Sequence, residues 1–210
     1  MSSPSGDVRL DSSLRRGFDV LLSFLGLVSL SPLLLTLGCL VRRSSPGPAI
    51  FRQERVGRGG KPFQLWKFRT MGVGAEAAGP PVSGQSDPRV TALGTWLRAR
   101  RLDELPQLVN VARGDLTIFG PRPEVARYVA HYTDEERELL RVRPGVLGPG
   151  AILFAQSHAA QLDSVSDPEA YYIRHQLHDK LALDLDYLRN RSCRREIAIL
   201  ARTLRVVAQR

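Results

Sequence analysis

The most pronounced hydrophobic pattern in the chain is an uninterrupted apolar run near its N-terminus. Residues 20–41, VLLSFLGLVSLSPLLLTLGCLV, contain no charged side chain. A straight α-helix of this length would measure about 33 Å, enough to cross the hydrocarbon core of a bilayer. The run is longer than the apolar part of a secretory signal, and no clear cleavage site of small residues follows it. The pattern therefore predicts a membrane helix, in preference to a signal peptide or a buried helix of a soluble protein.

Two features of this run favour a helix that enters and leaves the membrane on one side. Arginines occupy positions 15–16 before the run and 42–43 after it, and positive flanks favour the cytoplasmic side. Ser31-Pro32 lies near the middle, where proline removes a helical hydrogen bond and predicts a kink. We expect a re-entrant helix over about residues 17–41. A kinked helix that crosses the bilayer is the alternative that remains open.

The next pattern is that of a β-hairpin. Strand-like runs over about residues 49–56 and 62–70 flank Gly59-Gly60. Residues 72–90 are rich in glycine, alanine, proline and serine and have no apolar periodicity, so we interpret them as a surface loop.

Helical patterns dominate the remainder. Thr133 and Glu136 form a capping box, which predicts a helix start near residue 134. The last stretch combines arginines with apolar residues at helical spacing. Such a basic amphipathic helix either lies on an anionic membrane surface or docks onto the domain. The apolar positions are Ile197, Leu200, Ala201, Leu204 and Val207.

Together these elements predict an α+β chain that is mostly helical. Residues 1–43 form an N-terminal segment with the re-entrant helix, and residues 44–210 form a cytoplasmic domain that carries the small hairpin and ends in an amphipathic helix. We find no internal repeat and expect no second domain.

Composition narrows the choice of partners. The 210 residues carry a formal net charge of +9, and 43% of them are hydrophobic. A folded chain of this charge favours an anionic partner, which could be nucleic acid, phospholipid headgroups or a phosphorylated substrate. Charge alone does not choose among these classes.

Neither the cysteines nor the histidines predict a metal site. Cys39 and Cys193 lie far apart and match no metal or redox spacing, which suggests unpaired thiols in a reducing compartment. His175 and His178 lie three residues apart, with Asp179 adjacent, but no further ligand is evident. We interpret both histidines as surface residues.

Two adjacent carboxylates form the first candidate site. Asp103 and Glu104 stand side by side in LDELPQLVN, directly before Pro106. Neighbouring carboxylates repel, so a metal ion, a set of phosphate-binding cations or solvent must offset the cost. Pro106 suits the first turn of a helix. The pair would then lie at the positive end of a helix dipole, which favours the ionised carboxylates.

A second candidate is Arg122, which lies between two prolines in GDLTIFGPRPE, residues 114–124. We expect a strand or extended stretch that ends in a rigid turn. The prolines restrict the backbone, which suits a guanidinium that must be held in place. When this motif is taken alone, an ordinary loop arginine is the better explanation.

Taken together, the segments resemble the bacterial sugar transferases of the monotopic phosphoglycosyl transferase family, in its minimal catalytic form. The resemblance covers about residues 15–205, and the matching pieces occur in the family's order. They are RRGFDVLLSFLGLVSLSPLLL, GPAIFRQERVGRGGKPFQLWKFRTM, DPRVTALGTWLRARRLDELPQLVNVARGD, FGPRPE, VRPGVLGPG and KLALDLDYL.

The resemblance implies a helix that re-enters the membrane at Ser31-Pro32 and a catalytic unit on the cytoplasmic face of the bacterial inner membrane. It implies transfer of a sugar 1-phosphate from a nucleotide-sugar, usually a UDP-sugar, to polyprenyl phosphate, with release of UMP. Mg²⁺ would be the cofactor. The partners would be the donor, the lipid acceptor and inner-membrane lipids, without nucleic acid, and a homodimer is one alternative for the assembly.

The resemblance also implies roles for individual residues. Asp103 would be the nucleophile that forms a phosphosugar-aspartyl intermediate, and Glu104 would ligate Mg²⁺. The substrate-binding positions would be Lys67, Arg69, Arg98, Arg122 and Asp184. The segment PGAILFAQSHAAQLDS, residues 149–164, departs from many relatives and leaves the identity of the sugar open.

Two other classes of function compete with this reading. A membrane-anchored nucleic-acid-binding or regulatory protein would explain the positive charge, and it would retain DNA or RNA in a salt-dependent way. It leaves the Asp103-Glu104 pair and the Gly-Pro-Arg-Pro turn unexplained. A non-catalytic partner in a polysaccharide assembly complex is disfavoured because the carboxylate pair is intact.

Overall fold

The computed structural model describes residues 13–208, so the first twelve residues of the predicted segment 1–43 lie outside the described residues. The chain is mostly helical, as expected. Its longer helices are α1 (Ser13–Ser29), α2 (Ser31–Ser44), α3 (Ala92–Ala99), α4 (Gln107–Arg113), α8 (Pro168–His175), α9 (Leu177–Arg189) and α10 (Cys193–Ala208). The strands are β1 (Ile50–Val56), β2 (Pro62–Phe68), β3 (Thr117–Phe119) and β4 (Gly145–Leu147).

Short helical segments connect these elements. They are α5 (Ala126–Val129), α6 (Pro149–Leu153), α7 (Ala159–Gln161), the 3₁₀ helices η1 (Arg58–Gly60), η2 (Leu102–Glu104), η3 (Glu136–Arg141) and η5 (Leu162–Ser164), and the π-helix η4 (Phe154–His158). Segment 149–164, whose sequence departs from that of many relatives, is therefore helical along its length. The predicted capping box is present, since Thr133 Oγ1 accepts from the Glu136 N–H and Glu136 Oε2 from the Thr133 N–H.

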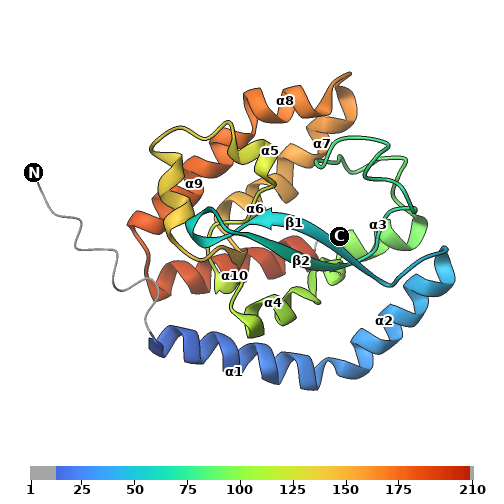
Figure 1. Ribbon diagram of the computed structural model, residues 1–210, viewed down its shortest axis with the longest axis horizontal. Coiled ribbons are helices and arrows are strands. Elements are labelled where there is room, and N and C mark those ends of the chain that lie inside the picture. Colours follow the sequence, from blue (N-terminus) through green and yellow to red (C-terminus); the bar gives the residue numbers. More distant parts are fainter. Residues whose placement is uncertain (1–12, 209–210) are drawn as a thin grey trace, which may run out of the picture.

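Helices α1 and α2 form a bent pair along one side of the molecule, with a bend of 65° between them (Figure 1). Pro32 stands in the first turn of α2 and has no N–H to donate to the Val28 carbonyl. The Ser31 hydroxyl donates to that carbonyl instead, at 2.8 Å. The predicted kink at Ser31-Pro32 is therefore confirmed, and the serine satisfies the acceptor that the proline leaves free.

Within residues 13–208, no single helix has the length and apolarity of a membrane span, although the bent pair meets both conditions when its two helices are counted together. Much of the pair's apolar surface faces outward. The side chains that are more than half exposed are Leu14, Phe18, Leu21, Phe24, Leu25, Val28 and Leu35.

Polar contacts hold α1 to the rest of the chain. Arg16 donates to the carbonyls of Val111 (2.6 Å) and Ala112 (2.8 Å), near the C-terminal end of α4. Helix α4 packs along α1 (Figure 1). The predicted division between residues 43 and 44 stays a prediction.

The hairpin forms as expected. Strands β1 and β2 pair antiparallel, with Ile50 opposite Phe68 and Val56 opposite Pro62. Gly59 and Gly60 have φ values of 68° and 75°, a conformation that glycine adopts readily and that reverses the chain here. Strand β3, predicted within 114–124, pairs parallel with β4.

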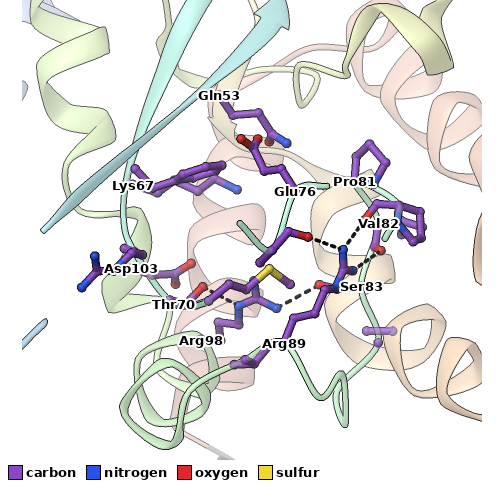
Figure 2. A pocket seen from close by; sticks show the side chains of 18 of the residues that line it. Gln53, Lys67, Thr70, Glu76, Pro81, Val82, Ser83, Arg89, Arg98 and Asp103 are labelled. Atoms are coloured by element: carbon purple, nitrogen blue, oxygen red, sulfur yellow. Dashed lines mark hydrogen bonds between the residues drawn. The ribbon is translucent and has the colours of Figure 1, made fainter. Parts of the chain in front are cut away.

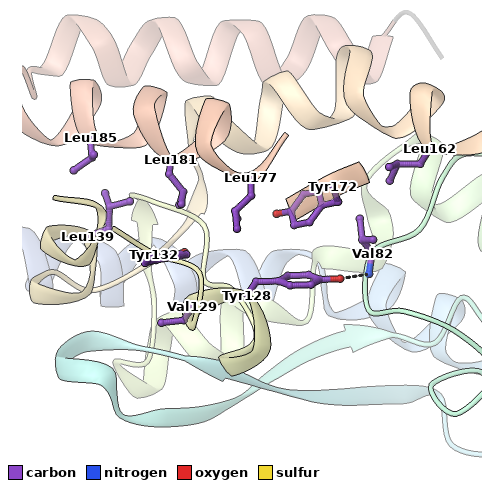
Figure 3. Close-up of a cluster of buried hydrophobic side chains, with 10 residues drawn as sticks. All are labelled: Val82, Tyr128, Val129, Tyr132, Leu139, Leu162, Tyr172, Leu177, Leu181 and Leu185. Carbon is purple, nitrogen blue, oxygen red and sulfur yellow. Dashed lines mark hydrogen bonds between the residues drawn. The ribbon is translucent and has the colours of Figure 1, made fainter. Parts of the chain in front are cut away.

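The largest hydrophobic core lies between α5, η3, α8 and α9 (Figure 3). Its side chains include Tyr128, Leu139, Tyr172 and Leu181. The Tyr128 hydroxyl accepts a hydrogen bond from the Val82 N–H, which ties the loop 72–90 to this core. The loop is therefore packed against the body of the domain.

Candidate active site

A cavity of about 830 Å³ opens between the hairpin, the loop 72–90, α3 and the helices that follow β4 (Figure 2). The loop 72–90, which the sequence predicts to lie at the surface, forms one of its walls. Six of the predicted site residues line the cavity, namely Lys67, Arg69, Arg98, Asp103, Glu104 and Arg122. Asp184 is not among the lining residues.

The two carboxylates lie in the 3₁₀ turn η2, just before α4. Arg101 precedes the turn with φ 54° and ψ 21°, the left-handed conformation. This reversal ends α3 and directs the chain into η2, and Pro106 then leads into α4. The Asp103-Glu104 pair, called the dyad below, therefore lies between helices α3 and α4.

Glu104 is held by two arginines. Arg122 Nη2 donates to Glu104 Oε1 at 2.7 Å, and Arg122 Nη1 donates to Oε2 at 3.1 Å. Arg101 Nη2 also donates to Oε2, at 2.9 Å. Burial raises the pKa of the Glu104 carboxyl, but the charges of Arg101 and Arg122 outweigh it and lower the pKa to about 2. Glu104 is thus firmly ionised, as the sequence predicted.

The pKa of the Asp103 carboxyl shifts in the opposite direction, upward, so the expectation from the helix dipole is wrong for this residue. Its side chain is 7% exposed, and burial together with the charge of Glu104 raises the pKa of its carboxyl. The charges of Lys67, Arg98 and Arg101 act against this shift. Desolvation outweighs them because, among residues 13–208, no arginine forms a forked pair with Asp103 as Arg122 does with Glu104.

Two cations from other elements face the dyad. Arg98, on α3, donates to the Thr70 and Ser83 hydroxyls at 2.9 Å each, which holds its guanidinium at the cavity wall (Figure 2). Lys67 projects from β2. Burial and the charge of Arg122 lower the pKa of the Lys67 ammonium to about 7.

Asp184 lies behind Arg122, outside the cavity. Its carboxylate is 2% exposed and accepts hydrogen bonds from the backbone N–H groups of Gly150 (3.0 Å) and Arg122 (3.4 Å). Burial raises the pKa of the Asp184 carboxyl to about 7. In this geometry Asp184 positions the Pro-Arg-Pro turn.

Arg69 lines the cavity, but its guanidinium points elsewhere. It donates to the carbonyls of Val41 (3.2 Å), Ser45 (2.7 Å) and Pro46 (2.5 Å) at the C-terminal end of α2. The Val41 carbonyl belongs to the last turn of α2, where a helix leaves its carbonyls without intrahelical partners, and the Ser45 and Pro46 carbonyls follow directly after the helix. Arg69 therefore connects the hairpin to the bent helix pair.

Three features of the site leave little or no signal in the sequence. The first is the pairing of Arg101 with Glu104. The second is Arg89, which organises the loop 72–90, and whose only sequence signal is its spacing from Asp87. The carboxylate of Asp87 and the carbonyls of Ala75, Pro80 and Val82 accept hydrogen bonds from it.

The third is a buried polar network in the cavity wall. Lys180 Nζ donates to Glu124 Oε1 and to the Tyr172 hydroxyl, both at 2.6 Å. Tyr172 also donates to Glu124 Oε1 at 2.9 Å. Arg55 completes the network at Glu124 Oε2, 3.3 Å away.

The dyad suits Mg²⁺ better than a metal that needs a protein cage. Within residues 13–208, no cluster of three or more histidine, cysteine or acidic side chains could hold a metal ion. Mg²⁺ commonly binds one or two carboxylates and fills its remaining positions with water and substrate phosphate oxygens. Asp103 and Glu104 can supply that number. His178 Nδ1 lies 2.7 Å from Glu136 Oε1, and neither His175 nor His178 belongs to a metal cluster.

Comparison with known proteins assigns the chain to a family. Residues 10–210 match the family described as bacterial sugar transferase. A Bacillus subtilis protein named as a putative undecaprenyl-phosphate N-acetylgalactosaminyl 1-phosphate transferase is 42% identical over 123 residues, which cover 59% of this chain and 69% of that protein.

Two other relatives are named UDP-glucose:undecaprenyl-phosphate glucose-1-phosphate transferase. The Escherichia coli protein is 37% identical over 91% of this chain, and this chain spans only 39% of its length. The Caulobacter vibrioides protein is 34% identical over 90% of this chain and 68% of its own. Since the family match spans nearly the whole sequence, the chain belongs to the bacterial sugar transferase family.

Proposed function

We propose that this protein transfers a sugar 1-phosphate from a UDP-sugar to undecaprenyl phosphate, as an initiating step of exopolysaccharide assembly. The observation that carries the proposal is the Asp103-Glu104 pair, which faces a cavity that Lys67, Arg98 and Arg122 also line. The cations suit a diphosphate, and the pair suits covalent phosphoryl chemistry. The names of the relatives support the donor and acceptor classes.

In the first half-reaction, a carboxylate oxygen of Asp103 attacks the sugar-proximal phosphorus of the donor. The bond from that phosphorus to the bridging oxygen breaks, and UMP departs with the electron pair. Asp103 then carries the phosphosugar as an acyl phosphate. In the second half-reaction, a phosphate oxygen of the lipid acceptor attacks the same phosphorus. The aspartyl–phosphorus bond breaks, Asp103 is restored, and a polyprenyl-diphospho-sugar forms.

The surrounding residues would orient the donor and stabilise charge. Arg98 and Arg122 are placed to bind phosphate oxygens, since each is anchored by neighbouring side chains or backbone. Glu104 would hold Mg²⁺, which when bound would shield the diphosphate and stabilise the departing UMP. The low exposure of Asp103 would limit the water that could compete for the phosphosugar.

The bent helix pair would seat the protein in the cytoplasmic leaflet of the inner membrane and bring the cavity to the lipid acceptor. Its exposed apolar residues support this placement. So does α10, in which Ile197, Leu200 and Leu204 are 68%, 42% and 60% exposed. Glu196 of α10 pairs with Arg15 of α1 at 2.5 Å, so the apolar faces belong to adjoining helices.

Labelling of single cysteines tests the re-entrant topology. With Cys39 and Cys193 replaced by serine, Ser13→Cys and Ser45→Cys should both resist a membrane-impermeant thiol reagent in intact cells, and both should react once the membrane is opened. Labelling of Ser13→Cys in intact cells would show that the chain crosses the bilayer.

Mass spectrometry tests the covalent step. Protein mixed with a UDP-sugar, without acceptor, should gain the mass of the phosphosugar on Asp103 and release one equivalent of UMP. Asp103→Asn should lose the adduct and the turnover. The exposed Asp134→Asn is the matched control and should behave as the wild type. Turnover without any adduct would replace the proposal with direct transfer between donor and acceptor.

A screen of UDP-sugars with short-chain polyprenyl phosphate and Mg²⁺, read out as UMP, identifies the sugar. The relatives are named for different sugars, among them glucose, galactose and N-acetylgalactosamine. Salt-dependent retention of DNA or RNA with no UMP release from any donor would instead favour a nucleic-acid-binding protein.

A further inference from the structure

Arg101 is the only non-glycine residue with a positive φ among residues 13–208. The left-handed region is unfavourable for a side chain of this size. This conformation turns the Arg101 side chain back toward Glu104, three residues later, where its guanidinium donates a hydrogen bond of 2.9 Å. Arg101 also lines the cavity. The strained residue and the acidic dyad therefore form one structural unit.

In this unit, both oxygens of Glu104 are already engaged. Oε1 accepts from Arg122, and Oε2 accepts from Arg122 and Arg101. Mg²⁺ requires direct contact with an oxygen at about 2.0–2.1 Å and a nearly regular octahedron. Oε2 already accepts from two guanidinium groups, so a metal ion can bind this oxygen, or both oxygens at once, only if a guanidinium moves aside. The Arg122 guanidinium holds both oxygens of Glu104 and also reaches the Val146 carbonyl at 3.4 Å, whereas Arg101 donates to Glu104 through one nitrogen, so Arg101 is the one freer to move.

The local charge points the same way. Arg98, Arg101 and Arg122 face the cavity around Asp103 and Glu104, with Lys67 beside them, so three guanidinium groups already stand against two carboxylates. A bare divalent cation would add to an excess of positive charge. A nucleotide diphosphate carries the opposite charge and offers phosphate oxygens, which guanidinium groups bind in the same forked way as carboxylates.

We infer that Arg101 is a positioning residue whose guanidinium blocks Glu104 from the metal until the metal and the diphosphate bind together. In the free enzyme its guanidinium pairs with Glu104, and on donor binding it transfers to a phosphate oxygen and leaves Glu104 to the metal. The free enzyme then binds divalent cations weakly, and the metal and the diphosphate bind cooperatively. The inference rests on the proposed function only in taking a nucleoside diphosphate as the ligand.

Binding of Mn²⁺, followed by electron paramagnetic resonance on the full chain without nucleotide, tests the closed state. Arg101→Gly removes the guanidinium, and glycine accepts the left-handed backbone, so the fold should be kept. Arg101→Asn, which also tolerates this conformation, is a second variant. Both should bind Mn²⁺ about tenfold more tightly than the wild type, because a charge-assisted hydrogen bond no longer competes.

Arg100→Ser is the matched control. It removes the same charge one residue away, but Arg100 stacks over Trp96 at 4.8 Å and does not line the cavity. This variant should bind Mn²⁺ as the wild type does. Equal Mn²⁺ affinity in the wild type and in both Arg101 variants would overturn the inference, as would an equal gain in Arg100→Ser.

Titration with UDP measures the cooperativity. Saturating Mg²⁺ should tighten UDP binding to the wild type by a larger factor than to Arg101→Gly, because coupling between two ligands is reciprocal. Equal factors would contradict the transfer of Arg101 to a phosphate. If no UDP-sugar yields UMP with any variant, the proposed function fails, but the Mn²⁺ comparison without nucleotide still decides the role of Arg101.

Discussion

Asp19, on helix α1, accepts a hydrogen bond of 2.7 Å from the hydroxyl of Thr117 at the start of β3, 98 residues away in the sequence. Its other carboxylate oxygen accepts from the Ile118 N–H at 3.2 Å. Asp19 is 3% exposed, although its helix presents apolar side chains outward. Because β3 leads into the Pro-Arg-Pro turn, this contact links the position of the bent helix pair to that of Arg122.

Asp19→Ala should therefore destabilise the protein. The substitution leaves the buried Thr117 hydroxyl and the partly buried Ile118 N–H without this acceptor, which costs about 1–3 kcal/mol of unfolding free energy. Thermal unfolding in detergent micelles measures the loss. Thr117→Ser keeps the hydroxyl and should lose much less. If Asp19→Ala unfolds at the wild-type temperature, α1 is not anchored through this carboxylate.

Gly94→Ala should displace Arg98 from its position at the cavity wall. A Cβ at position 94 would lie 2.1 Å from the carbonyl oxygen of Thr70, so α3 would have to move away from the end of the hairpin. Arg98 donates to the Thr70 hydroxyl and would move with the helix. We expect a loss of about 1–3 kcal/mol of stability and weaker UDP binding by calorimetry.

Gly17→Ala is the control for that substitution. A Cβ at Gly17 meets no atom within 4 Å, and alanine favours a helix more than glycine does. Stability should be unchanged or slightly higher. Equal effects of the two alanine substitutions would remove the argument from close packing at Gly94.

Arg69→Lys should affect the helix pair more than the ligand. A lysine ammonium cannot span the carbonyls of Val41, Ser45 and Pro46 as the guanidinium does. We expect a lower melting temperature, with UMP affinity changed by less than about twofold. Arg98→Lys is the comparison and should weaken UMP binding. A large loss of UMP affinity in Arg69→Lys at unchanged stability would restore Arg69 as a substrate contact.

The pKa of Lys67, lowered to about 7, predicts a pH dependence. The ammonium is charged below that pH and loses its proton as the pH rises through it, so attraction for the diphosphate should fall on the alkaline side. The measurement is kcat/KM for the donor between about pH 6 and about pH 9. Lys67→Arg keeps its charge over this range and should lack the alkaline decline. An identical decline in both proteins would assign it to another group.

Features set by local chemistry followed from the sequence. The Ser31-Pro32 bend, the hairpin turn at Gly59-Gly60 and the capping box at Thr133 each depend on a few neighbouring residues, because missing N–H groups, positive φ values and side-chain caps act over one or two turns. Asp103 and Glu104 are neighbours in the chain, so the acidic pair could also be recognised from the sequence alone.

The tertiary structure decided what those residues do. Asp184 lies behind Arg122 although 62 residues separate them, and Arg69 caps a helix that ends 25 residues earlier in the chain, at Ser44. The opposite pKa shifts of Asp103 and Glu104 also follow from tertiary placement. Burial and charge at a site depend on which distant segments pack around it, and a linear pattern of hydrophobic and polar residues does not contain that information.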